Sequence, residues 1–181
     1  MNKSPLNKLI GTWKGNKGMD IAPEDGGQEE NPYYETLIIE PVDIEIENAD
    51  IQELLAVKYY QLVKEKANDE VSHSESGYWI WDKNENTIMN SFSIPRGVCV
   101  LAGGEFSENS ANETTFNVSA KLDDPSFGII QSPFMMKKAK TMTFQRDLKV
   151  SDNKLYYKQE TTVDIYGKIF NHTDTNQLTK I

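Results

Sequence analysis

The sequence contains few cysteines and histidines, the residues that supply reactive thiols and the ligands of most protein metal sites. It has one cysteine and two histidines in 181 residues. A single cysteine excludes an internal disulfide and a cysteine-rich metal site. Because Cys99 lies in the apolar run G-V-C-V-L, we expect its thiol to be buried and unreactive.

Positive charge and long apolar runs are also scarce. The sequence has 19 lysines and arginines and 28 acidic residues, which gives a net charge of −9. Nucleic acids and anionic membranes recruit basic patches, so this balance disfavours both as partners. No segment approaches the roughly 18 apolar residues of a spanning helix, and the N-terminus M-N-K-S-P-L-N-K-L-I lacks the apolar region of a signal peptide. We expect a cytoplasmic protein without membrane insertion, and its oligomeric state stays open.

The chain instead consists largely of short segments typical of β-strands. They are rich in β-branched and aromatic residues and are separated by Gly, Pro, Asn and Asp. This pattern predicts an all-β fold, an antiparallel up-and-down barrel of the lipocalin or fatty-acid-binding-protein type with about ten strands, over one domain spanning 1–181. The acidic, Gly- and Pro-containing stretch 21–32 is expected to be a loop. The expected strands are 11–19, 33–41, 52–65, 71–82, 87–94, 97–103, 114–122, 140–150, 154–166 and 168–180.

One connection is longer and more apolar than the rest. Residues 123–139 read D-D-P-S-F-G-I-I-Q-S-P-F-M-M-K-K-A. Long apolar connections in compact domains are usually lids or ordered covers. Both alternatives stay open for this segment.

The stretch 71–82, V-S-H-S-E-S-G-Y-W-I-W-D, carries most of the functional information. The period of two in a strand places His73, Glu75, Trp79 and Trp81 on one face. Bulky groups on one face and small polar groups on the other indicate that the bulky face packs inward, against side chains or a ligand. We therefore predict that His73, Glu75 and Trp79 line an interior cavity.

Two further strands carry candidate site residues. Arg146 lies on the same face as Phe144, where it would receive a ligand carboxylate, form an ion pair with an acid of a neighbouring strand, or extend its charged group to the surface. His172 shares a face with Asp174, and the two are either a hydrogen-bonded pair or part of a metal site. We place Phe144 and Arg146 in the cavity. No nucleophile elbow or nucleotide-binding glycine motif is present, so we assign no catalytic residue.

Three segments together resemble the nitrobindin family of haem-binding β-barrel domains, which are similar in shape to fatty-acid-binding proteins. The segment L-I-G-T-W-K-G-N-K-G resembles the family opening L-x-G-x-W-x-G-x-G-x-G. The segment H-S-E-S-G-Y-W at 73–79 resembles H-x-E-x-G-[FY]-W, and the histidine of the final strand resembles the C-terminal haem-ligand region.

This resemblance implies a ten-stranded antiparallel barrel with a small-ligand cavity, in which some members hold ferric haem through one histidine. It makes His172 the candidate haem-iron ligand and places His73 on the opposite side of the cavity. If haem is bound, the resemblance implies nitric oxide or peroxynitrite chemistry.

The expected function is therefore to bind a small hydrophobic or planar molecule, haem being one candidate. The alternatives are a carrier of a fatty acid or other lipid, with Arg146 or Arg96 as carboxylate partner, and a barrel with a filled interior that binds no haem. If both histidines point inward, they bracket the cavity from opposite walls.

Overall fold

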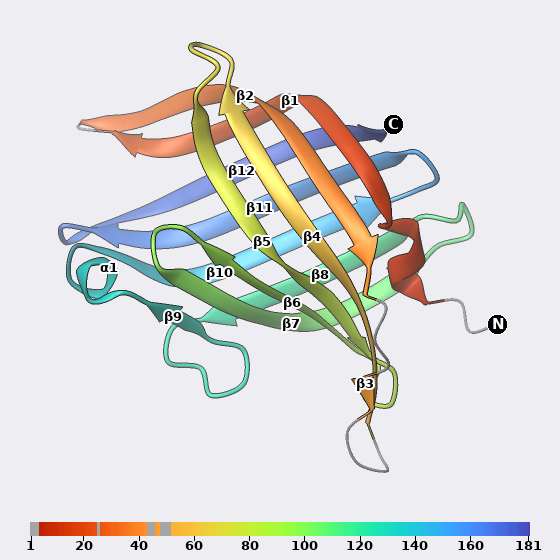
Figure 1. Cartoon of the computed structure of the whole chain (residues 1–181). Coiled ribbons are helices and arrows are strands. Elements are labelled where there is room, and N and C mark those ends of the chain that lie inside the picture. Colours follow the sequence, from red (N-terminus) through yellow and green to blue (C-terminus); the bar gives the residue numbers. More distant parts are fainter. Residues whose placement is uncertain (1–3, 25, 43–45, 48–51) are drawn as a thin grey trace.

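The computed structural model describes residues 4–24, 26–42, 46–47 and 52–181 and shows a closed antiparallel barrel (Figure 1). Two short strands lie beside the barrel wall, β3 (Ile46–Glu47) next to β4 and β9 (Ile129–Gln131) next to β7. The wall itself consists of β1 (Gly11–Glu24), β2 (Gly27–Pro41), β4 (Glu53–Glu65), β5 (Val71–Asp82), β6 (Thr87–Ile94), β7 (Val98–Glu108), β8 (Thr114–Lys121), β10 (Ala139–Val150), β11 (Lys154–Ile165) and β12 (Lys168–Lys180).

The strands follow one another around the wall almost in chain order. Their spatial order is β2-β1-β12-β11-β10-β8-β7-β6-β5-β4, and antiparallel pairing of β2 with β4 closes the ring. The first strand also pairs with the last, β1 with β12. The predicted all-β, up-and-down barrel is confirmed.

Helix is limited to two short segments in the described part of the chain. The 3-10 helix η1 (Pro5–Lys8) starts where Ser4 accepts a hydrogen bond from the Leu6 N–H at 3.2 Å. The α-helix α1 (Pro133–Lys138) lies at the opposite end of the barrel from η1 (Figure 1). Neither is long and apolar enough to cross a membrane.

The connection 123–139 covers the α1 end of the barrel. Its strand β9 adds to β7, and α1 follows directly. Met135 is 8% exposed and packs inward, whereas its neighbour Phe134 is 63% exposed. The connection therefore packs on the barrel through Met135 in this structure.

The η1 end of the interior is tightly packed. Trp13 and Trp79 are almost wholly buried, and the Trp79 ring lies 5.6 Å from that of Phe116. Trp81 has the same inward face but is only partly buried, and it packs edge-on against Phe106 at 6.0 Å. The inward face predicted for β5 is therefore correct.

Two expectations about individual segments are wrong. The stretch 21–32 is not a loop, because β1 and β2 continue through it as a hairpin that turns at Gly26. The pairing is carried by backbone hydrogen bonds, so polar side chains do not prevent it. Cys99 is exposed rather than buried, because Val98 and Val100 take the inward positions and the alternation of the strand turns Cys99 outward.

We expect Trp79→Ala to cost about 3–5 kcal/mol of unfolding free energy, because it removes a large aromatic ring from a packed core. Denaturant unfolding measures this cost. Tyr78→Ala is the matched control on the same strand, because Tyr78 is exposed and its loss should change stability by no more than about 0.5 kcal/mol. Equal unfolding midpoints for Trp79→Ala and the wild type would contradict the packing described above.

Candidate functional site

A cavity of about 380 Å³ occupies the α1 end of the barrel. Its two sides differ in chemistry. The apolar side comes mainly from β6, β7, β10, β11 and α1, and its main residues are Phe92, Val98, Val100, Met135, Phe144 and Val163. The polar side comes mainly from β1, β5, β11 and β12, and its main residues are Asp20, His73, Glu75, Gln159, His172 and Asp174.

The two histidines both line this cavity. His73 lies on β5 and His172 on β12, with β1, β2 and β4 between them on one side and the rest of the wall on the other. The rings therefore approach the cavity from nearly opposite walls. Their side chains are 35% and 34% exposed, so solvent reaches the cavity.

The residues predicted from sequence separate into two groups. His73, Glu75 and Phe144 line the cavity, together with His172. Trp79 is not among the lining residues, because it lies further along β5 in the packed core.

Arg146 is likewise not a lining residue, because it is buried in an ion pair with Glu75. The guanidinium bonds both carboxylate oxygens, Nη1 to Oε1 at 2.9 Å and Nη2 to Oε2 at 3.1 Å. It also donates to Asn90 Oδ1 at 2.9 Å, Gln159 Oε1 at 3.0 Å and the Tyr59 hydroxyl at 3.3 Å. Every N–H direction is thereby used.

The surroundings of this ion pair fix its charge state. The guanidinium lies 5.1 Å and 5.2 Å from the ring centroids of Phe92 and Phe144. Burial alone would raise the pKa of Glu75, but the charge of Arg146 and hydrogen bonds from His73 and Arg146 outweigh it and lower that pKa to about 2. The pair is therefore ionised, and Arg146 has no free donor for a ligand carboxylate.

A second buried network surrounds Glu35 of β2. Sequence reasoning did not single out Glu35 as a site residue. Its carboxylate accepts hydrogen bonds from Gln61 Nε2 at 2.8 Å, the Tyr157 hydroxyl at 2.8 Å and Asn176 Nδ2 at 2.7 Å. Burial raises the pKa of Glu35. The available signal was its inward position in β2, between Tyr33 and Leu37.

Together these two networks form a polar layer across the barrel, which separates the packed core from the cavity. On β10 the order is Phe144 in the cavity, Arg146 in the layer and Leu148 in the core. The layer is defined by Glu35, Tyr59, Gln61, Glu75, Asn90, Arg146, Tyr157, Gln159 and Asn176.

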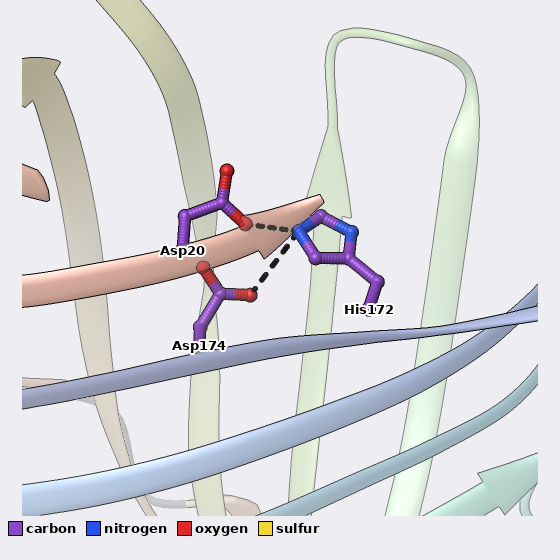
Figure 2. Close-up of side chains that lie close together, drawn as sticks. All are labelled: Asp20, His172 and Asp174. Carbon is purple, nitrogen blue, oxygen red and sulfur yellow. Dashed lines mark hydrogen bonds and ion pairs between the residues drawn. The ribbon is translucent and has the colours of Figure 1, made fainter. Parts of the chain in front are cut away.

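A cluster of three ionisable side chains lies on the polar side of the cavity (Figure 2). Asp20 of β1 and Asp174 of β12 are direct register partners, and His172 precedes Asp174 by two residues on the same face. His172 Nε2 lies 2.5 Å from Asp20 Oδ1 and 3.8 Å from Asp174 Oδ2. Sequence reasoning paired His172 with Asp174 but missed Asp20, which only the β1–β12 register brings to them.

The cluster has a distinct electrostatic character. Burial lowers the pKa of His172, but the hydrogen bond that His172 donates to Asp20 and the charges of both carboxylates outweigh this effect and raise that pKa. Burial, aided by the charge of Asp20, raises the pKa of Asp174 to about 6 even though His172 opposes the shift. The cluster therefore places one imidazole, whose pKa is raised, against two acidic side chains.

The chain matches the model of the THAP4-like, heme-binding beta-barrel domain over residues 2–180. It belongs to this family. The crystal structure of Rv2717c from M. tuberculosis is similar to this THAP4-like barrel, with a TM-score of 0.72 and 16% sequence identity over 97% of this chain and 94% of that one. At this identity the likeness shows the fold alone. No curated protein matches the chain.

The residues of this THAP4-like barrel do not fit haem iron in the arrangement observed. An axial histidine presents a neutral, unoccupied imidazole nitrogen to iron. The Nε2 atom of His172 is hydrogen-bonded to Asp20, and that of His73 lies 3.5 Å from Glu75 Oε2. Both candidate ligands are thus engaged by carboxylates.

Hemin titration tests this conclusion. We expect wild type and His172→Ala to give the same absorption spectrum at each hemin concentration, because the Nε2 atom of His172 is already engaged by Asp20. The control is His73→Ala, which removes the other cavity histidine. A Soret shift present in the wild type and in His73→Ala but absent from His172→Ala would contradict this expectation and would identify His172 as the iron ligand.

A double-mutant cycle tests the ion pair of the polar layer. Arg146→Met should cost about 3–5 kcal/mol, because it leaves the Glu75 carboxylate buried without a counter-charge. Adding Glu75→Leu should recover part of that loss, which denaturant unfolding measures as a coupling free energy. The exposed pair Lys158–Glu160 is the control, where Glu160→Gln should cost no more than about 1 kcal/mol. Simple additivity of the two core substitutions would exclude the pairing.

Proposed function

We propose that this barrel binds a small molecule with an apolar or planar body in its cavity, with a polar group toward the Asp20–His172–Asp174 side. The observation that carries the proposal is the division of the cavity into an apolar and a polar side. Small-molecule sites typically combine an apolar lining with a few convergent polar groups that fix the orientation of the ligand.

The dimensions of the cavity support the same proposal. Its volume of about 380 Å³ lies within the roughly 300–1,000 Å³ of known ligand pockets. The partial exposure of both histidines gives a ligand access from solvent. Haem, which the family description names, would require His172 to leave its hydrogen bond with Asp20.

A second candidate is a carrier of a fatty acid or another lipid acid. Arg146 does not suit this role, because all its donors are engaged in the polar layer. Arg96 suits it better, since it lines the cavity and its side chain is exposed. A carboxylate at the cavity mouth would pair with this guanidinium.

Blocking the cavity tests whether ligands bind inside the barrel. Thr161 lines the cavity and Thr162 faces outward on the same strand, so Thr161→Trp and Thr162→Trp place the same side chain on opposite faces. We expect Thr161→Trp to abolish the fluorescence increase of an anionic apolar dye. The control Thr162→Trp should bind the same dye with wild-type affinity. Equal dye binding by the two variants would place the dye elsewhere and overturn the proposal.

The same assay separates the two candidate ligand classes. A fluorescent long-chain fatty acid should bind Arg96→Gln more weakly than wild type if a carboxylate pairs with Arg96. Unchanged binding of the fatty acid by Arg96→Gln would exclude that pairing. Binding of the uncharged alcohol of the same chain length gives the contribution of the apolar body alone.

A further inference from the structure

We propose that Asp20, His172 and Asp174 form a binding site for a divalent transition-metal ion of the zinc class in the wall of the cavity. Among the described residues, these three form the one group of metal-ligating side chains whose donor atoms all lie within 4.8 Å of one another. One imidazole nitrogen and two carboxylate oxygens form a donor set that zinc accepts. Calcium and magnesium prefer oxygen ligands alone, so the imidazole favours zinc over them.

The site is built by strand register rather than by chance contact on a flexible surface. Asp20 and Asp174 are opposite each other in the β1–β12 pair, and His172, two residues before Asp174, lies on the same face. All three are partly buried, and their side chains line the cavity. Figure 2 shows both carboxylates pointing toward the imidazole. The backbone of two paired strands therefore fixes the distances between the three donors.

The charges of this cluster favour a divalent cation. Two carboxylates directly opposite each other on paired strands repel each other. Among the described residues, no lysine or arginine nitrogen lies within 4.0 Å of Asp20 or Asp174, and His172 is their one ion-pair partner. A divalent ion would balance both carboxylates and would replace the direct contact between His172 Nε2 and Asp20 Oδ1.

The surroundings supply the outer hydrogen bonds that orient metal ligands. Asn31 Nδ2 donates to Asp20 Oδ2 at 3.5 Å, and Gln159 Nε2 donates to Asp174 Oδ2 at 3.4 Å. Gln159 also accepts from Arg146, so the site is connected to the polar layer. With three protein ligands, the remaining coordination position would face the cavity, as in zinc sites that bind an exchangeable ligand.

Cobalt titration tests the site. Cys99 is exposed and its thiol could bind the metal, so Cys99→Ser serves as the background for every protein. We expect one equivalent of Co²⁺ to give the visible bands of a four-coordinate ion, which Zn²⁺ then displaces. His172→Gln, Asp20→Asn and Asp174→Asn should each weaken binding by more than about tenfold, the lower bound for the loss of an outer-shell partner.

The matched control is His73→Gln, which removes the other histidine of the same cavity and should leave Co²⁺ affinity unchanged. Circular dichroism shows which variants are folded, and Asp174→Asn keeps the shape of the side chain. The inference fails if the background protein binds no Co²⁺ at millimolar metal, or if His172→Gln binds it as well as the background protein does. It also fails if His73→Gln abolishes binding.

The inference does not depend on the proposed function, and dye binding to the same proteins separates the two. Dye binding without metal binding overturns the metal site alone. The opposite result has two parts: the three ligand variants lose metal binding, and no protein binds the dye. That result supports the metal site and overturns the proposed small-molecule function.

Discussion

The buried ion pair between Arg146 and Glu75 is the interaction on which the interior of this barrel depends. A charge inside a protein is tolerated only when it is paired and its remaining hydrogen-bonding directions are satisfied. The guanidinium is 6% exposed and the carboxylate 1%, so each needs the other. Arg146 satisfies its remaining N–H groups by donating to Tyr59, Asn90 and Gln159, which therefore lie in the same layer.

This polar layer determines where the barrel is solid and where it is hollow. On the η1 side, aromatic and aliphatic side chains fill the interior, and the Trp13 indole N–H donates to the Leu9 carbonyl at 2.7 Å. On the α1 side, the layer presents Gln61, Glu75, Tyr157 and Gln159 to a cavity. The cavity therefore has three chemically different surfaces: the polar layer, the apolar side, and the Asp20–His172–Asp174 cluster on β1 and β12. This division is the physical basis of the proposed ligand binding.

The inward face of β5 and β10 could be predicted from sequence, because side chains alternate along a strand, whereas Cys99 of β7 was assigned to the wrong face. His73, Glu75 and Phe144 were placed in the cavity on that basis, and they line it. Alternation does not give the height of a residue along the barrel axis. Trp79 and Arg146 have the predicted inward face but lie in the core and the polar layer, below the cavity.

Contacts between distant segments could not be predicted in the same way. Glu75 and Arg146 are 71 residues apart, and Asp20 and His172 are 152 residues apart. Their meeting depends on which strands are neighbours and in which register, which composition and periodicity do not contain. The hairpin over 21–32 was missed for a related reason, since backbone pairing forms it without an apolar pattern.

The most direct test of the account is a native mass spectrum of the protein purified from its own host without refolding. The account predicts a non-covalent adduct of small-molecule mass, released on collisional activation to give the mass of the bare chain. Thr161→Trp, purified in the same way, should lack that adduct. A spectrum that contains the bare chain alone, or an adduct of equal abundance in Thr161→Trp, would contradict the claim that the cavity is a ligand-binding site.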